Sequence, residues 1–167
     1  MRYMKQEAIM HKIIERKTFS KILAAKAEFR TSNSDKIVDY AINIAQDYDA
    51  QLIILHVIRA DTKLHGIRPP SHIIEMRKEA QAHFAKITER IHETSTSIKE
   101  NTLKIRTEII ASIRIADAIV SYAEDKHIDL IIVGTRGRSK LKSVLLGSVA
   151  SDVIRYAHCP VLTITNY

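Results

Sequence analysis

The sequence is poor in cysteine, in aromatic residues and in long apolar runs. Its single cysteine, Cys159, excludes an intramolecular disulfide framework. Aromatic residues make up only 5% of the chain, which is few for the stacking surfaces that bind single-stranded nucleic acid, so no nucleic-acid partner is expected. No apolar run approaches the length of a membrane span, and no secretory signal is visible. We therefore expect a cytoplasmic protein that does not enter a membrane.

The length and the composition are those of a single domain with a hydrophobic core. The chain has 167 residues, of which 46% are apolar, and its formal net charge is +7. Basic residues are concentrated in the first 21 residues and again between Arg136 and Lys142, where no acidic residue occurs. Such a charge attracts polyanions or small phosphorylated ligands. We expect residues 1–18 to form an N-terminal extension and residues 19–167 to form the domain.

Apolar runs alternate with segments of helical periodicity along the chain. The run 51–58 is almost continuously apolar, as in a strand that is buried on both faces. Strands that alternate with helices imply a parallel sheet with helices packed against it. The sequence predicts strands over 21–25, 51–58, 102–110, 128–133 and 160–165, and helices over 34–50, 71–98, 116–127 and 148–157.

Glycine is scarce, yet three of the four glycines lie between residues 134 and 148. Gly134 and Gly137 follow a predicted strand, where the lack of a Cβ lets backbone amides approach a ligand. Gly147 and Ser148 stand at the start of a predicted helix, with Ser148 as the expected N-cap. The free N–H groups of a helix start suit a phosphate. The spacing fits neither a Walker A loop nor G-x-G-x-x-G, so these residues alone leave two readings open: a ligand loop, or tight turns before a capped helix.

The pattern Gly134-x2-Gly137-x9-Gly147-Ser148 resembles the nucleotide-binding signature of the universal stress protein family. The surrounding segment, from Asp129 to Ile164, is also similar to the C-terminal third of that family. The resemblance covers about residues 20–166. It implies an α/β fold of the adenine-nucleotide alpha-hydrolase-like type, with a doubly wound five-stranded parallel sheet in the order 3-2-1-4-5 and helices on both faces. It also implies a homodimer that pairs through the last strand, residues 160–165, and a bound ATP, with or without Mg²⁺.

The resemblance also implies a set of nucleotide-binding positions. Backbone amides of the loop would hold the phosphates, Arg138 would supply charge, and apolar strand ends would flank the adenine. For Val57 and Val133 the alternative is an ordinary place in the core, because apolar residues at strand ends are usually buried there. The full set is Gly134, Gly137, Arg138, Gly147, Ser148, Val149, Ala150, Val133, Val57, Ala25 and Lys26.

The end of the first predicted strand departs from the family pattern. Family members usually have an aspartate there that contacts the ribose or a metal, whereas this chain reads AAKAEFRTSNS. The equivalent position is Ala27 or Phe29, with Glu28 between them, and Lys26 brings a positive charge. Two hypotheses follow: an ATP-binding regulatory protein, or a dimerisation module of the same family that does not bind nucleotide.

Other chemistries find little support in the sequence. The eight histidines include no pair at metal-ligand spacing, since His72 and His83 would be three helical turns apart. His56 is expected to be a hydrogen-bonded histidine at a strand end, and Cys159 a structural residue before Pro160. No set of residues resembles a catalytic site, so we expect no catalytic residues, no metal ligands and at most slow ATP hydrolysis. An ATP-using enzyme of a related fold would need a glycine loop after the first strand, which is absent.

Overall fold

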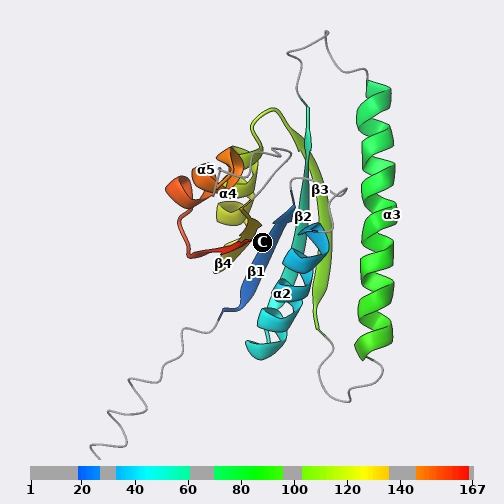
Figure 1. Cartoon of the computed structure of the whole chain (residues 1–167), viewed down its shortest axis with the longest axis vertical. Coiled ribbons are helices and arrows are strands. Elements are labelled where there is room, and N and C mark those ends of the chain that lie inside the picture. The colour runs from blue at the N-terminus through cyan, green and yellow to red at the C-terminus, as the bar shows by residue number, and fades with distance from the viewer. Residues whose placement is uncertain (1–18, 27–32, 61–69, 96–102, 136–145, 166–167) are drawn as a thin grey trace, which may run out of the picture.

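Five parallel strands form one sheet in the order β3-β2-β1-β4-β5. The computed structural model describes residues 19–26, 33–60, 70–95, 103–135 and 146–165 (Figure 1). The strands are β1 (Lys21–Lys26), β2 (Gln51–Arg59), β3 (Ile105–Ser112), β4 (Leu130–Gly134) and β5 (Val161–Ile164). The helices are α2 (Asn33–Asp47), α3 (Pro70–Ser95), α4 (Ile115–Asp125) and α5 (Ser148–Tyr156). The predicted fold class and strand order are thereby confirmed.

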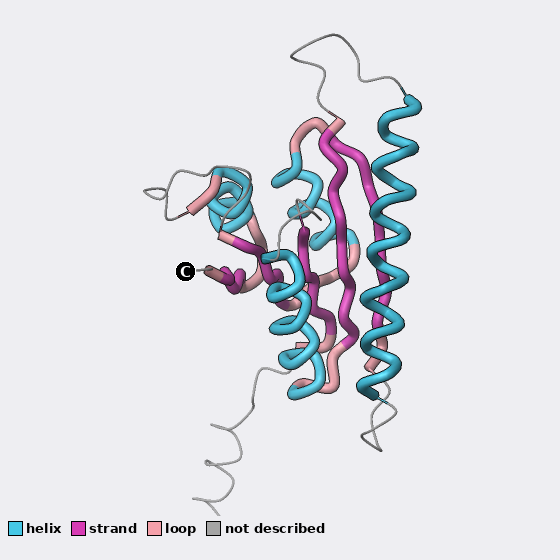
Figure 2. Tube along the Cα trace, turned by 45° about the vertical axis from the view of Figure 1, so that its right-hand side comes forward, coloured by secondary structure: helices cyan, strands magenta, loops and turns pink. Residues whose placement is uncertain are grey.

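Helices cover both faces of the sheet, with α2 and α3 on one face and α4 and α5 on the other (Figure 2). Successive side chains of a strand point to opposite faces, so β1 supplies both cores. Ile22 and Ala24 are buried against α2, whereas Leu23 and Ala25 belong to the cluster beneath α4 and α5. Burial on both faces explains why β1 and β2 read as continuous apolar runs.

The chain reverses its direction of winding between β1 and β4. Successive connections from β1 lead outward to β2 and β3, and the chain then returns to the other side of β1 to form β4 and β5. In an open parallel sheet, ligands bind beyond the carboxyl ends of the strands at this point of reversal. The glycine loop follows β4, so the fold places it where a ligand is expected.

Strand β4 begins at Leu130, two residues later than predicted. The apolar residue Ile128 belongs to the turn that ends α4: its N–H donates to the carbonyl of Ala123 at 2.9 Å, and His127 has a positive φ of 52°. This is the pattern of a Schellman motif, in which the residue after the left-handed position is often apolar and packed against the helix. Asp49 ends α2 with a similar positive φ. The third strand also begins and ends later than predicted, at Ile105 and Ser112.

Asp129 joins the start of β1 to the start of β4. Its Oδ2 accepts hydrogen bonds from the backbone N–H groups of Ser20 and Lys21, both at 2.9 Å. These two bonds stabilise the contact between the starts of the strands, because hydrogen bonds to a charged acceptor are stronger than neutral ones. Asp129 therefore has a structural role at the amino edge of the sheet, opposite the glycine loop.

Candidate functional site

The two ends of the glycine loop lie side by side at the carboxyl edge of the sheet. Gly134 ends β4, and the next residue, Thr135, accepts a hydrogen bond at its carbonyl from the N–H of Gly147 at 2.6 Å. The N–H of Thr135 donates in turn to the carbonyl of Ile164 at 3.0 Å. Thr135 is therefore a buried junction that fixes both ends of the loop to β4 and β5. Residues 136–145, with the predicted site residues Gly137 and Arg138, lie outside the described residues.

Helix α5 starts directly at this junction. Its first helical hydrogen bond runs from the N–H of Ser151 to the carbonyl of Gly147, at 2.9 Å. The N–H groups of Ser148, Val149 and Ala150 precede that bond, so they have no acceptor within the helix. Together with the positive end of the helix dipole, such amides attract an anion.

The predicted N-cap is wrong by one residue. Gly147 occupies the N-cap position with an extended backbone, φ −73° and ψ 158°, and Ser148 is the first residue of the helix. The reason is that the carbonyl of Gly147, rather than that of Ser148, accepts the first helical hydrogen bond. The N–H of Ser148 therefore belongs to the first turn of the helix and is one of its amides without an acceptor in the helix.

The apolar residues of the predicted site are buried beside the loop. Ala25 and Val133 are direct neighbours in the β1–β4 ladder, and both belong to the core beneath α4 and α5. Val57 and Ala150 are buried in the same cluster. The expected core role is thus confirmed for Val57 and Val133, whereas a contact with adenine stays a prediction.

Lys26, the last residue of β1, is almost completely buried, with 1% of its surface exposed. Its Nζ lies 3.1 Å from Nε2 of His83 in α3. Lysine is among the residues that are least often buried, so this position is unusual. The sequence indicated Lys26 as a site residue, but it gave no sign of His83, which is 57 positions away and meets Lys26 only through the tertiary fold.

His56 forms one cluster with Lys26 and His83, in which His56 and Lys26 are buried and His83 is half-buried. It pairs with Lys26 in the β1–β2 ladder, and its Nδ1 lies 3.0 Å from the carbonyl oxygen of Lys26. Burial lowers the pKa of His56 to about 4, the backbone hydrogen bond opposes this change, and the charges of Lys26 and His83 lower the pKa further. The predicted hydrogen bond of His56 is confirmed, but the residue lies within β2, which continues to Arg59, and not at its end. His56 is neutral at physiological pH.

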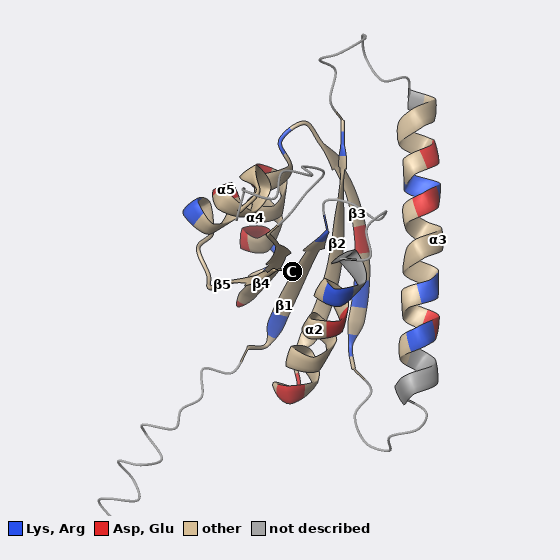
Figure 3. Ribbon diagram, viewed as in Figure 1, with Lys and Arg blue, Asp and Glu red and all other residues tan. Residues whose placement is uncertain are grey.

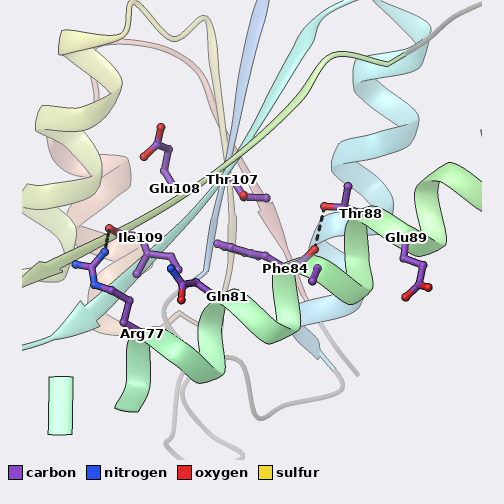
Figure 4. Close-up of a pocket in the computed structure, with 9 residues that line it drawn as sticks. Arg77, Gln81, Phe84, Thr88, Glu89, Thr107, Glu108 and Ile109 are labelled. Atoms are coloured by element: carbon purple, nitrogen blue, oxygen red, sulfur yellow. Dashed lines mark hydrogen bonds between the residues drawn. The ribbon is translucent and has the colours of Figure 1, made fainter. Parts of the chain in front are cut away.

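A separate groove of about 570 Å³ lies between α3 and the edge strand β3 (Figure 4). Arg77 donates a hydrogen bond from Nη1 to the carbonyl of Ile109 at 3.2 Å and so covers part of the strand edge. Gln81, Thr88 and Thr107 add polar groups to the lining. Acidic and basic residues alternate along α3 (Figure 3). The groove lies at the β3 edge of the sheet, on the other side of β1 and β2 from the glycine loop.

In the part of the chain that the structure describes, no three or more His, Cys, Asp or Glu side chains gather as they would around a metal ion. Among the described helices, none is both long enough and apolar enough to cross a membrane.

The fold and the loop define a doubly wound α/β protein with a glycine-rich segment after its fourth strand. Residues 18–165 match the model of the universal stress protein family, and the chain belongs to that family. It is 35% identical to the universal stress protein MJ0531 of Methanocaldococcus jannaschii, over 85% of this chain and 82% of that one. It is 37% identical to the universal stress protein YxiE of Bacillus subtilis strain 168, over 78% of this chain and 90% of that one.

A solved structure shows the same fold. A universal stress protein in complex with cAMP superposes with a TM-score of 0.61 at 23% identity, covering 89% of this chain and 98% of that chain. At this level of identity the similarity concerns the fold.

Proposed function

We propose that this universal stress protein binds ATP at the carboxyl edge of β1 and β4. The hydrogen bond between Thr135 and Gly147 carries the proposal, because it brings the start of α5 next to Gly134 at the point where the sheet reverses its winding. A glycine and a helix start lie together where the sheet reverses its winding, and such a combination suits a phosphate.

In this site the phosphates lie against the N–H groups of Ser148, Val149 and Ala150. Gly134, Gly137 and Gly147 let the backbone approach them closely, and Arg138 supplies positive charge. The adenine lies near Val57 and Val133, and Ala25 and Lys26 form the wall at the end of β1. That a protein of the same fold has been solved in complex with cAMP supports a nucleotide as the ligand.

We also propose that the protein is cytoplasmic and forms a homodimer that pairs through residues 160–165. Strand β5 is an edge strand, and Leu162 within it is 37% exposed. Ile154 and Tyr156 of the preceding helix are exposed as well. Exposed apolar side chains beside an unpaired strand edge favour association with a second copy. The nucleotide would then alter the surface offered to other proteins, with hydrolysis slow or absent.

Calorimetric titration of nucleotide-stripped protein with ATP tests the proposal. We expect binding at micromolar strength or better, accompanied by thermal stabilisation. Gly137→Val should abolish this binding without lowering the melting temperature of the ligand-free protein, since a branched side chain blocks the backbone approach. Gly137→Ala should weaken binding less. Binding by Gly137→Val as strong as that of the parent would contradict the loop assignment.

The alternative is a dimerisation module that has lost nucleotide binding. It is favoured by the sequence at the end of β1. The strand ends in the buried Lys26, and residues 27–34 include no aspartate. The same titration separates the two functions, because the module would show no heat and no thermal stabilisation even at millimolar ATP. In that case the glycines would serve the turn geometry alone.

A further inference from the structure

We infer that ATP binding and dimerisation strengthen each other through Thr135. The inference rests on the proposed function and adds how its two parts regulate one another. Thr135 joins β5, the strand at which the two copies are proposed to meet, to the start of α5, at which the phosphates are proposed to bind. A dimer should therefore bind ATP more tightly than a monomer, and ATP should favour the dimer.

A series of hydrogen bonds leads from β5 through Thr135 to α5. The carbonyl of Ile164, the last residue of β5, accepts from the N–H of Thr135 at 3.0 Å and from its hydroxyl at 3.4 Å. The carbonyl of Thr135 accepts from the N–H of Gly147 at 2.6 Å, and the carbonyl of Gly147 accepts the first helical bond, from Ser151. The position of the helix start therefore depends on a residue that is itself held by β5.

Thr135 is buried, with 3% of its surface exposed. If the end of β5 detached, the N–H and the hydroxyl of Thr135 would lose the carbonyl of Ile164 as their acceptor. Leaving buried donors without an acceptor is unfavourable. We therefore expect the end of β5 and the junction at Thr135 to be ordered together or loosened together.

Strand β5 is held from one side only. It has four residues, and its neighbour in the sheet is β4. Because Ile164 faces β4, where it bonds to Thr135, the backbone groups of Val161 and Thr163 face the open edge. Short segments with an exposed backbone open locally at a low free energy. A second copy paired at this edge would hold β5 from both sides, and it would thereby stabilise Thr135 and the start of α5.

The same contacts act in the reverse direction when ATP binds. A phosphate held by the N–H groups of Ser148 and Val149 fixes the first turn of α5, with Gly147 as its N-cap. Through Gly147 and Thr135 the ligand then stabilises the end of β5 against opening. Thermodynamic linkage requires that ATP favours the dimer as strongly as the dimer favours ATP.

Titration of the parent protein with radiolabelled ATP at two protein concentrations tests the inference. Well above the dissociation constant of the dimer, we expect binding about tenfold tighter than far below it, a coupling of ordinary size. Because a dimer has two sites, saturating ATP should tighten the dimer in sedimentation by about a hundredfold, the square of the first ratio. Hydrogen exchange gives an independent measurement. Near the dissociation constant of the dimer, ATP should slow exchange at the N–H groups of Val161 and Thr163.

Thr135→Val and Thr135→Ser form a matched pair of variants. Valine has nearly the same shape but no hydroxyl, so the carbonyl of Ile164 keeps only its backbone donor, and the ratio of ATP affinities should fall to about threefold or less. Serine keeps the hydroxyl and should keep the tenfold ratio.

The outcomes separate the inference from the proposed function. Equal ATP affinity of monomer and dimer, or the same ratio in both Thr135 variants, overturns the inference and leaves ATP binding and the dimer intact. If the parent binds ATP at neither concentration, or forms no dimer, the proposed function itself fails, and the inference fails with it.

Discussion

The Nδ1 of His56 lies 3.0 Å from the carbonyl oxygen of Lys26, and this contact links the interior of β2 to the last residue of β1. A carbonyl oxygen only accepts, so Nδ1 carries the proton of the neutral ring and Nε2 is left as an acceptor. The ring is buried, with 3% of its surface exposed, next to the cationic Lys26. The hydrogen bond therefore fixes the tautomer of His56, whereas burial and the charge of Lys26 lower the pKa and keep the ring neutral.

The buried neutral His56 should make stability depend on pH. Its pKa is about 4 in the folded protein, below the ordinary value of 6.5, because burial and then the charges of Lys26 and His83 disfavour the imidazolium. Between these two values the unfolded chain binds the proton more readily, so stability falls as the pH drops from about 6.5 to 4. The loss from this group is on the order of 3 kcal/mol.

Urea unfolding from pH 4 to pH 7.5 measures this dependence. His56→Gln should flatten the slope between pH 4 and 6.5, because it removes the proton that the unfolded chain takes up. His127→Gln is the control, since His127 is exposed in the turn after α4. An equally steep slope in His56→Gln would show that other groups dominate the acid sensitivity.

Removing the charge of Asp129 should weaken the amino edge of the sheet. Both N–H groups, of Ser20 and Lys21, donate to the same oxygen, Oδ2, and an asparagine amide would offer a neutral and therefore weaker acceptor there. We expect Asp129→Asn to lower the free energy of unfolding by about 1–2 kcal/mol. The control is Asp125→Asn at the exposed end of α4, with an expected change within about 0.5 kcal/mol. An equal loss of unfolding free energy in the two variants would contradict the structural role of Asp129 at the amino edge of the sheet.

A substitution at Gly147 distinguishes the two interpretations of the glycine loop, a phosphate-binding loop or tight turns before a capped helix. Its φ of −73° is open to any residue, so the backbone does not demand glycine there. Serine is a good N-cap, and Gly147→Ser should keep the unfolding free energy within about 0.5 kcal/mol. If the glycine exists for close approach of phosphate, the same variant should weaken ATP binding about tenfold or more. Calorimetry measures the ATP affinity and urea unfolding measures the unfolding free energy of the same preparation. An unchanged ATP affinity would show that the glycine serves the turn geometry alone.

The sequence predicted the sheet because its strands are buried on both faces. β1 and β2 show this as continuous apolar runs, and the resemblance to the family added the strand order, which periodicity does not contain. Apolar character alone did not separate a strand from the turn before it. Ile128 is buried like a strand residue, yet it packs as the end of the α4 turn. The early start predicted for the fourth strand was wrong for that reason.

The candidate site was predictable where its residues are close in sequence. Gly134, Gly147 and the start of α5 belong to one segment whose spacing is informative. The contact between Lys26 and His83 joins a strand to a helix across 57 residues, and no local pattern signals such a pair. The position of the N-cap was missed by one residue, because the choice between Gly147 and Ser148 depends on which carbonyl accepts the first helical hydrogen bond.

The proposed dimer makes a prediction for Leu162. This residue lies in the edge strand β5 and is 37% exposed, so a charge there should face the second copy. We expect Leu162→Lys to shift the protein from dimer to monomer in sedimentation at micromolar concentration, because an unpaired charge buried in an apolar interface is costly. Ile74→Lys is the control: Ile74 is 55% exposed on α3, at the opposite side of the sheet from β5. It should leave the dimer intact. Removal of residues 1–17 should leave it intact as well, and a monomer after that truncation would place the interface in the extension instead of β5.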